Sequence, residues 1–235
     1  MKDRVVALIA AAGRGTRMGG GAQYKKQYFM LGDRPVLAHT VSIFEESPLV
    51  GDIVIVVCPE DIDYCQREVV AKYGFKKVSK IIPGGEQRAD SVYQGLLALE
   101  PDTEIVLIHD GVRPFFPPAL IGEVVQAVCT YQAAVVAVPV KDTIKIADMA
   151  GFARKTPDRR FLWAVQTPQG FSYPLLMQAY RAARQKKLQA TDDAMLVEAL
   201  GCRVKLVLGT YENMKITTPE DFILAEALLE KGAPK

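Results

Sequence analysis

The stretch VVALIAAAGRGTRMGGG, Val5 to Gly21, joins an apolar run to a segment that holds five glycines and two arginines. The apolar run is typical of a strand buried on both faces of a parallel sheet. Ligands in open α/β sheets bind at the carboxyl ends of the strands, where the glycine segment follows. Glycine lets a backbone approach a ligand closely, and successive N–H groups attract anions. The stretch therefore predicts an α/β fold with an anion site directly after its first strand.

The rest of the chain alternates between strand-like and helix-like segments. Short runs rich in Val and Ile indicate strands at 4–10, 52–58, 77–82, 104–109 and 133–139. Apolar residues at helical spacing indicate helices at 35–47, 61–73, 86–99 and 117–131, and a last helix with Thr218 as N-cap and Pro219 at its first position. This alternation predicts a mostly parallel sheet with right-handed crossovers. We interpret residues 1–235 as a single Rossmann-like domain, since this length is ordinary for one core.

One segment, about 140–171, breaks the alternation. Strand-like pieces at 142–147 and 160–166 are separated by Gly151 and by Pro157-Asp158. We interpret the segment as an extended β-arm that leaves the main sheet. An exposed ribbon has unpaired edges, and pairing with a second subunit is one remedy. The alternative is a long hairpin folded onto its own domain, and the pattern alone leaves both open.

Composition excludes several classes of partner. The formal net charge of +2 and the charged content of 24% give no reason to expect nucleic acid or an anionic membrane. No apolar run reaches about 20 residues, the length of a membrane span, and the start of the chain has no signal-peptide pattern. The four cysteines lie far apart without a C-x-x-C pair, which favours free thiols over a zinc site. We expect a cytoplasmic protein that binds neither nucleic acid nor membrane.

Four interpretations compete for the glycine segment. A Walker loop requires Lys and Ser or Thr where Gly21 and Ala22 stand, and a dinucleotide fingerprint requires glycine where Met18 stands. A flexible surface turn with solvated charges is the third alternative. A nucleotidyltransferase loop, in which backbone N–H groups surround a triphosphate, explains best why cations crowd near the glycines: Arg14, Arg17, Lys25 and Lys26.

Two further strand ends carry polar residues. Gly84-Gly85 follows the strand at 77–82, and Arg88, Asp90 and Ser91 open the next helix. The strand at 104–109 is followed by Asp110, Gly111 and Arg113, although an Asp beside an Arg is also an ordinary local ion pair. There is no G-x-S-x-G elbow in the sequence. A transfer reaction in which the substrate's own phosphate attacks needs positioning and charge stabilisation rather than a protein nucleophile.

Seven motifs occur in order along the chain: AAAGRGTRM with KKQY, GGEQRADSV, HDGVRPF, KDTIK, LWAVQTPQGF, TDDA and NMKITTPEDF. From about Val5 to Phe222 the chain thereby resembles the 2-C-methyl-D-erythritol 4-phosphate cytidylyltransferase family. The resemblance implies an enzyme that joins CTP to methylerythritol 4-phosphate, a polyol phosphate, and releases pyrophosphate with Mg²⁺ as cofactor. It also implies a homodimer in which the β-arm reaches the partner's site.

The resemblance assigns roles to particular residues. It implies a CTP cradle formed by Ala11, Ala12, Gly13, Gly15, Gly84, Gly85, Asp90 and Ser91. It implies that four cations act in catalysis, namely Arg17, Lys26, Arg159 and Lys215. It implies contacts to the methylerythritol phosphate from Asp110, Gly111, Arg113, Thr143, Lys145, Thr167 and Thr191. Mg²⁺ would be held mainly by the CTP phosphates, with Asp110 nearby.

Some of these positions have alternative explanations or depart from the family. Arg160 is the neighbour of Arg159, so either could hold the substrate phosphate. Thr191 is also a good helix N-cap. Gly111 and Val112 replace two alanines of the family. Lys25 replaces a proline, which frees the loop and adds a charge that either changes the affinity for CTP or competes with Lys26 for the phosphates.

Other functions remain as alternatives. A ribitol 5-phosphate cytidylyltransferase shares the glycine loop and the QTPQ motif, but the AAAG and DTIK sequences favour the methylerythritol enzyme. A sugar-phosphate nucleotidyltransferase that uses UTP or GTP, a nucleotide-binding module without catalysis, and a Rossmann-type dehydrogenase are weaker candidates.

Overall fold

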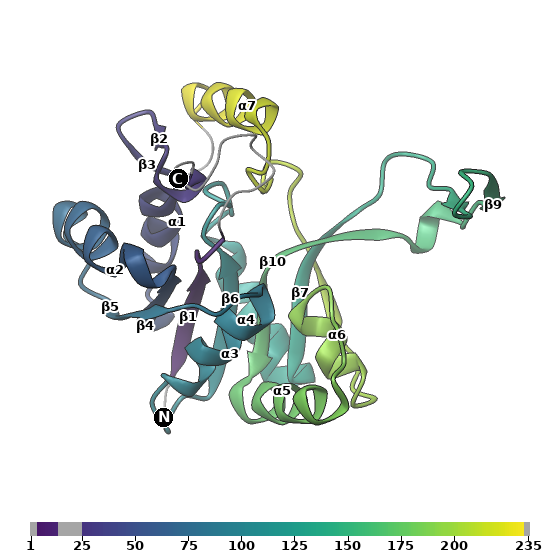
Figure 1. The fold of residues 1–235 in the computed structure, drawn as a ribbon, viewed down its shortest axis with the longest axis horizontal. Helices are drawn as coiled ribbons and strands as arrows, with labels where there is room; N and C mark the ends of the chain where they lie inside the picture. The colour runs from purple at the N-terminus through teal and green to yellow at the C-terminus, as the bar shows by residue number, and fades with distance from the viewer. Residues whose placement is uncertain (1–3, 14–24, 233–235) are drawn as a thin grey trace.

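The computed structural model describes residues 4–13 and 25–232, and a seven-stranded sheet lies at its centre (Figure 1). The strand order is β11-β7-β10-β6-β1-β4-β5. The bounds are β1 (Val5–Ala10), β4 (Val50–Val57), β5 (Val78–Pro83), β6 (Ile105–Asp110), β7 (Ala133–Pro139), β10 (Trp163–Ser172) and β11 (Lys205–Leu208). The five strands expected from apolar runs are confirmed at nearly the expected bounds.

Most neighbouring strands of this sheet run parallel. β1 pairs parallel with β4 and β6, β4 with β5, and β11 with β7, whereas β10 lies antiparallel between β6 and β7. The prediction of an α/β fold with a mostly parallel sheet is thus confirmed. The expected extent of the β-arm is wrong at its second limb, because residues 163–172 form β10 inside the sheet.

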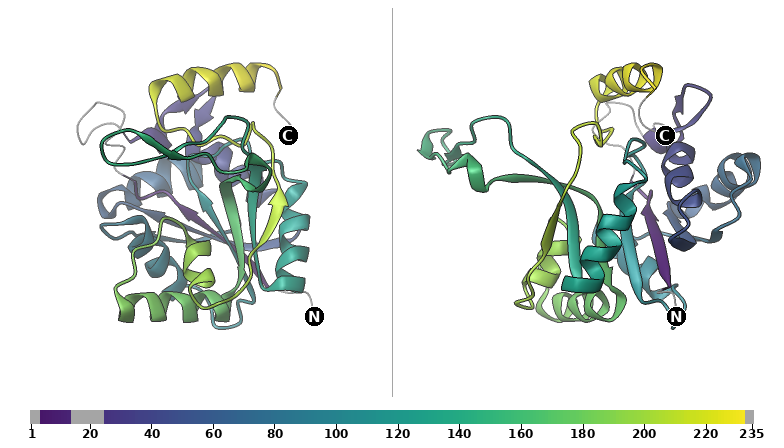
Figure 2. Two further views of the ribbon diagram at one scale, coloured as in Figure 1. Left: turned by 90° about the vertical axis from the view of Figure 1, so that its right-hand side faces the viewer. Right: turned by 180° about the vertical axis from the view of Figure 1, so that it is seen from behind.

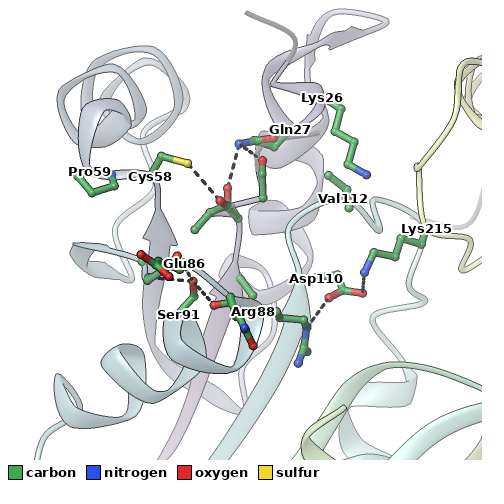
Figure 3. A pocket seen from close by; sticks show the side chains of 17 residues that line it. Lys26, Gln27, Cys58, Pro59, Glu86, Arg88, Ser91, Asp110, Val112 and Lys215 are labelled. Atoms are coloured by element: carbon green, nitrogen blue, oxygen red, sulfur yellow. Dashed lines mark hydrogen bonds and ion pairs between the residues drawn. The ribbon is translucent and has the colours of Figure 1, made fainter. Parts of the chain in front are cut away.

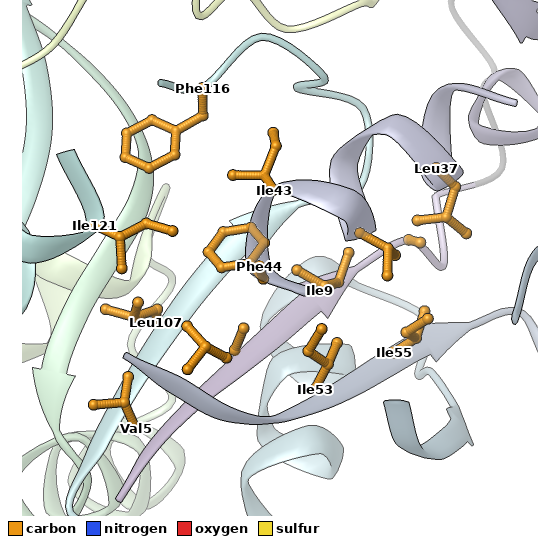
Figure 4. Close-up of a cluster of buried hydrophobic side chains, with 14 of the residues drawn as sticks. Val5, Ile9, Leu37, Ile43, Phe44, Ile53, Ile55, Leu107, Phe116 and Ile121 are labelled. Carbon is orange, nitrogen blue, oxygen red and sulfur yellow. The ribbon is translucent and has the colours of Figure 1, made fainter. Parts of the chain in front are cut away.

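Helices cover both faces of the sheet. The first face carries α1 (Val36–Glu45), the short α2 (Ile62–Tyr64) with the π-helix η4 (Cys65–Ala71), and α4 (Leu120–Tyr131). The opposite face carries α3 (Arg88–Leu97), α5 (Tyr173–Lys186) and α6 (Asp193–Glu198). Alternate residues of β1 point to the two faces: Ile9 packs in the first cluster and Leu8 in the second. Figure 4 shows Phe44 of α1 among the side chains of the first cluster.

The carboxyl edge of the sheet is covered by a small third cluster. The helix α7 (Pro219–Glu230) packs there with β2 (Met30–Leu31), which pairs with β3 (Arg34–Pro35), and with the residues that follow Asp110. The hydroxyl of Thr218 accepts a hydrogen bond from the Asp221 N–H, and the Asp221 carboxylate accepts one from the Thr218 N–H. The expected cap of this helix is therefore confirmed, with Pro219 in its first turn.

Residues 140–162 extend away from the body between β7 and β10 (Figures 1 and 2). We call this segment the arm. It carries the two-stranded ribbon β8 (Ile146–Ala147) with β9 (Ala153–Lys155), and the short 3-10 turn η5 (Arg159–Phe161). Across the described part of the chain, every helix is too short or too polar to cross a membrane.

Candidate active site

A cavity of about 650 Å³ opens at the carboxyl edge of the sheet (Figure 3). It lies beside the ends of β1 and β6. The strands β4 and β5 lie on one side of β1, whereas β6 and the later strands of the sheet lie on its other side. Ligands bind at such switch points in open α/β sheets. The wall consists of residues 10–13, 26–27, 58–59, 84–88, Ser91, Asp110, Val112 and Lys215.

The first part of the glycine segment forms one side of the cavity. The Ala11 N–H donates to the Val56 carbonyl at 2.8 Å, which continues the β1–β4 ladder beyond the strand. The Gln27 side-chain amide donates to the Ala11 carbonyl at 2.9 Å, and the Cys58 thiol donates to the Ala12 carbonyl at 3.1 Å. The predicted cradle residues Ala11, Ala12 and Gly13 line the wall. Gly15, Arg17 and Arg14 lie outside the described residues.

The second glycine turn packs directly against the first. A Cβ at position 84 would lie 2.5 Å from the Ala12 Cβ and 2.7 Å from the Ser91 Oγ, so only glycine fits between these two segments. The Gly85 N–H donates to the Ser91 Oγ at 3.1 Å. Gly84, Gly85 and Ser91, which the resemblance assigns to the CTP cradle, all line the cavity.

Asp110 is the buried acid of the cavity. Its carboxylate lies 3.3 Å from Arg88 Nε, 3.2 Å from Arg113 Nε and 3.0 Å from Lys215 Nζ. Burial raises the pKa of the carboxyl, but the charges of Arg88, Lys215 and Arg113 outweigh burial and hold the pKa below its ordinary value. Asp110 is therefore ionised at neutral pH. Because these three cations share two buried carboxylates, Asp110 and Asp193, this side of the cavity keeps a surplus of one positive charge that suits phosphate groups.

Two lysines complete the positive side of the cavity. Lys26 is only 8% exposed, and Figure 3 shows its side chain extending from η2 (Lys26–Tyr28) toward the same part of the cavity as Lys215. Lys215 precedes α7 and is a third exposed. The structure thus brings together Lys26, Asp110 and Lys215, which are far apart in sequence and were each predicted to act in the site.

Arg88 connects the cavity to the second layer of helices. Its guanidinium donates to Asp193 at 2.8 Å as well as to Asp110, and the Tyr180 hydroxyl donates to the same Asp193. Burial lowers the pKa of Arg88, but the charges of Asp193 and Asp110 more than compensate and raise it. Sequence reasoning noted Arg88 only as part of a motif and missed Asp193, because no local pattern indicates that α6 approaches α3. Gln27 and Cys58 were also missed.

Several predicted site residues support the wall from behind. Gly111 packs against Ala11, since a Cβ at position 111 would lie 2.8 Å from the Ala11 Cβ. Arg113 donates to the Asn213 carbonyl at 2.8 Å. Thr167 is buried, and its hydroxyl accepts from the Asp110 N–H at 3.1 Å. These three residues hold the Asp110 segment in place without lining the cavity themselves.

Asp90 and Thr191 have positions that differ from their expected ones. The Asp90 carboxylate pairs with Arg184 of α5 at 3.3 Å and does not line the cavity. Thr191, expected at the substrate, does not line the cavity either, and the alternative that it caps α6 is wrong, because the N-cap is Asp192, whose carboxylate accepts from the Met195 N–H at 3.0 Å. Asp192 is preferred because its side chain stands one residue closer to the N–H groups that need a partner.

The remaining predicted residues, Thr143, Lys145 and Arg159, belong to the arm and lie outside the wall of this cavity. Arg160 is held by Asp158 at 2.6 Å, whereas Arg159 donates to the neutral carbonyl of Lys141. Which of the two arginines binds a phosphate stays a prediction.

The cavity offers few protein ligands for a metal ion. Among residues 4–13 and 25–232, no three His, Cys, Asp or Glu side chains gather as a metal site. The wall offers the carboxylates of Glu86 and Asp110, and Asp110 already bonds three cations. Mg²⁺ is commonly held by one or two carboxylates together with substrate phosphates. The residues fit an ion held mainly by a bound nucleotide.

Comparison with known proteins gives a consistent result. Residues 5–231 match the family model described as IspD: 2-C-methyl-D-erythritol 4-phosphate cytidylyltransferase. The protein of that name from Pelotomaculum thermopropionicum is 54% identical over 228 residues, which cover 97% of this chain and 95% of that one. The 4-diphosphocytidyl-2C-methyl-D-erythritol synthase structure from Anaerococcus prevotii superposes with a TM-score of 0.86 at 32% identity, covering 97% of both chains. The Thermus thermophilus cytidylyltransferase structure gives a TM-score of 0.76 at 34% identity, covering 97% of this chain and 99% of its own.

Proposed function

We propose that this chain, which belongs to the 2-C-methyl-D-erythritol 4-phosphate cytidylyltransferase family, uses the cavity at the β1–β6 switch point as its active site. The chain is a cytidylyltransferase of the isoprenoid pathway, which transfers CMP from CTP to 2-C-methyl-D-erythritol 4-phosphate and releases pyrophosphate. The observation that carries the site assignment is the meeting of Lys26, Lys215 and Asp110 with two glycine turns in one cavity.

CTP would lie across the two glycine turns. The cytosine and ribose would face Gly84, Gly85 and Ser91, which all line the cavity. The triphosphate follows the backbone of residues 11–13 toward Lys26. Backbone N–H groups and a buried lysine both stabilise phosphate charge.

The reaction is an in-line displacement at the α-phosphorus. A phosphate oxygen of methylerythritol 4-phosphate forms the new P–O bond, the bond from the α-phosphorus to the oxygen bridging the β-phosphorus breaks, and pyrophosphate leaves with that oxygen. Negative charge grows on the equatorial oxygens, and Lys26, Arg17 and Lys215 would stabilise it. Asp110 would accept hydrogen bonds from the methylerythritol hydroxyls while it holds Lys215 in position at 3.0 Å.

Mg²⁺ completes this proposal as the cofactor. When bound, it would neutralise part of the triphosphate charge and so favour release of pyrophosphate. The protein residues near it would be Asp110 and Glu86. We expect chelation by EDTA to abolish pyrophosphate release and added Mg²⁺ to restore it.

The arm suggests how the site is completed. Arg159, Thr143 and Lys145 lie on a segment that extends away from the body, so in a homodimer they would serve the cavity of the partner subunit. Exposed apolar side chains on the arm support such an interface, since Met149, Phe152 and Phe161 are all mostly exposed in the single chain. We also propose a cytoplasmic location, which is supported by the four free thiols.

The decisive experiment is pyrophosphate release by the purified protein with CTP and Mg²⁺. We expect strong release with methylerythritol 4-phosphate and background release with ribitol 5-phosphate, a substrate for which the relatives named above give no support. Lys26→Ala should lower kcat by about 100-fold or more if Lys26 stabilises the transition state. A Lys26→Ala protein with nearly full turnover would place the chemistry elsewhere.

A further inference from the structure

The connection between β4 and α2 contacts the chain on both sides of the glycine segment. On one side, the Cys58 thiol donates to the Ala12 carbonyl at 3.1 Å. On the other side, the ammonium of Lys25 bonds the carboxylate of Asp61, and it lies 3.2 Å from Glu60 Oε1. Residues 58–61 are thus joined to residue 12 and to residue 25, and the same connection supplies Cys58 and Pro59 to the cavity wall.

The contact between Lys25 and Asp61 is a partly buried ion pair. The Lys25 side chain is 17% exposed and that of Asp61 is 10% exposed, whereas the Glu60 side chain is 55% exposed. Burial lowers the pKa of Lys25, but the bonds to Asp61 and Glu60 outweigh burial and raise it. The second carboxylate oxygen of Asp61 is buried and has no hydrogen-bond partner among the described residues. Loss of Lys25 would therefore leave a poorly solvated negative charge behind, which is costly.

The residue after Lys25 is the catalytic candidate Lys26. The Lys25 carbonyl accepts from the Tyr28 N–H at 2.9 Å and so starts the η2 turn that carries Lys26 into the cavity. The Tyr28 ring contacts Tyr64 of α2 edge-on, with ring centroids 4.8 Å apart. The η2 turn is thereby attached to the α2 region by one ionic and one aromatic contact.

We propose that the ion pair between Lys25 and Asp61 positions Lys26 for the triphosphate, so that Lys25 is a positioning residue of the nucleotide site. The inference rests on the proposed active site. It explains how the chain accommodates a second lysine beside Lys26: the ammonium of Lys25 is bonded by Asp61 and Glu60 and does not compete with Lys26 for phosphate.

The test compares Lys25→Ala, Lys25→Arg, Asp61→Asn and the double variant Lys25→Ala/Asp61→Asn. Pyrophosphate release gives kcat and the KM for each substrate, and urea unfolding gives the stability of each variant. Lys26→Ala serves as the reference for loss of the catalytic lysine. Lys72→Ala serves as the matched control, since Lys72 forms an exposed ion pair with Glu68 on the neighbouring helical segment at 3.6 Å.

We expect Lys25→Ala to lower kcat/KM for CTP by about 10-fold, because a small displacement of Lys26 weakens its contact with the transition state. The KM for methylerythritol 4-phosphate should change by less than about twofold, since that substrate binds elsewhere. Lys25→Arg should recover most of the activity. The double variant should lose no more than Lys25→Ala, because the two residues act through one contact.

Two results would overturn the inference. One is a Lys25→Ala enzyme with wild-type kcat/KM for CTP, and the other is losses from Lys25→Ala and Asp61→Asn that multiply in the double variant. A Lys25→Ala enzyme with unchanged kcat and equal rises in the KM for both substrates would also contradict it, because a purely structural role does not single out CTP. If Lys26→Ala is fully active, the proposed site fails instead, so the two failures can be told apart.

Discussion

The cavity and the arm use charged residues in opposite ways. In the cavity, Asp110 is 5% exposed and is bonded by cations that come from α3, from the β6 loop and from the segment before α7. In the arm, the ion pairs are exposed and local, such as Arg160 with Asp158 and Arg154 with Asp148. The first arrangement needs the whole fold, whereas the second needs only a few neighbouring residues.

The apolar side chains of the two regions differ in their exposure. Around the cavity, Val112 and Phe115 pack under α7. On the arm, Phe152 is 73% exposed and Phe161 is 78% exposed. Exposed aromatic side chains on an extended segment are typical of a surface that another molecule covers. The body thus pairs its buried charges across distant segments, whereas the arm leaves large aromatic side chains exposed in the single chain.

The largest expected effect is at Asp110. Asp110→Asn keeps the side chain's size but removes the charge that holds Arg88, Arg113 and Lys215 together. We expect the free energy of unfolding to fall by about 3 kcal/mol and pyrophosphate release to be largely lost. Urea unfolding and the pyrophosphate assay measure the two effects.

The matched control for this prediction lies on the arm. Asp158→Asn also removes a paired acid, but its partner Arg160 is exposed and can be solvated by water. Asp158→Asn should leave the free energy of unfolding nearly unchanged. Equal effects at the two positions would show that the contrast between a tertiary and a local ion pair is wrong.

An effect of similar size on stability, but confined to acidic pH, is expected from His109, which is fully buried in the body. Burial lowers its pKa from 6.5 to about 4 in the folded protein. Between these values the unfolded chain binds more protons, so stability is complete above pH 6.5 and falls as the pH decreases toward 4. The loss should reach about 3 kcal/mol at the end of this range. Urea unfolding between pH 7 and 4.5 measures most of it.

Variants separate His109 from the other histidine. His39 is partly buried, and its pKa is also lowered by burial, so it adds a loss in the same direction. His109→Asn should reduce the pH dependence strongly, while His39→Gln should reduce it less. The interpretation fails if the His109→Asn protein keeps the wild-type pH dependence of stability. Residues of the arm should not contribute to this dependence between pH 7 and 4.5.

The smallest expected change in free energy per residue concerns the arm. Phe152→Ser and Phe161→Ser should weaken self-association by roughly 2 kcal/mol for each ring that a dimer buries, or about 30-fold in Kd. Sedimentation velocity measures the shift from dimer to monomer. The unfolding of the body should change little, because both rings are exposed in the single chain.

A body residue provides the control for the arm variants. Ile223 of α7 is 67% exposed, and Ile223→Ser should leave the association state unchanged. If the Phe152→Ser/Phe161→Ser protein stays dimeric, the arm does not hold the subunits together. If Ile223→Ser dissociates the protein, the interface lies on the body instead.

The sequence was most informative where one short segment contains all the necessary information. Apolar runs such as residues 53–57 of β4 form strands because each of these residues is buried on one face or the other, and that pattern is visible locally. Glycine turns at strand ends also predicted the cavity, since parallel strands place their carboxyl ends at one edge. Lys26, Asp110 and Gly84 were found in this way.

Prediction was wrong or incomplete where position depends on distant partners. β10 was assigned to the arm because its sequence, with Pro168 inside, does not show that it lies between β6 and β7. Asp90 was expected at the nucleotide, but Arg184 from another helix holds its carboxylate. Asp193 was missed because its partner Arg88 lies far away in the sequence.

By itself, the sequence determined the α/β class, the order of most strands and helices, and the family, because these depend on local periodicity and on motifs in order. The tertiary structure decided which charges meet. Arg88, Arg113 and Lys215 gather on Asp110, and Lys25 bonds Asp61, only because the sheet brings their segments to one edge. The physical reason is that the pairing of buried charges depends on distances across the fold, which no local pattern of residues encodes.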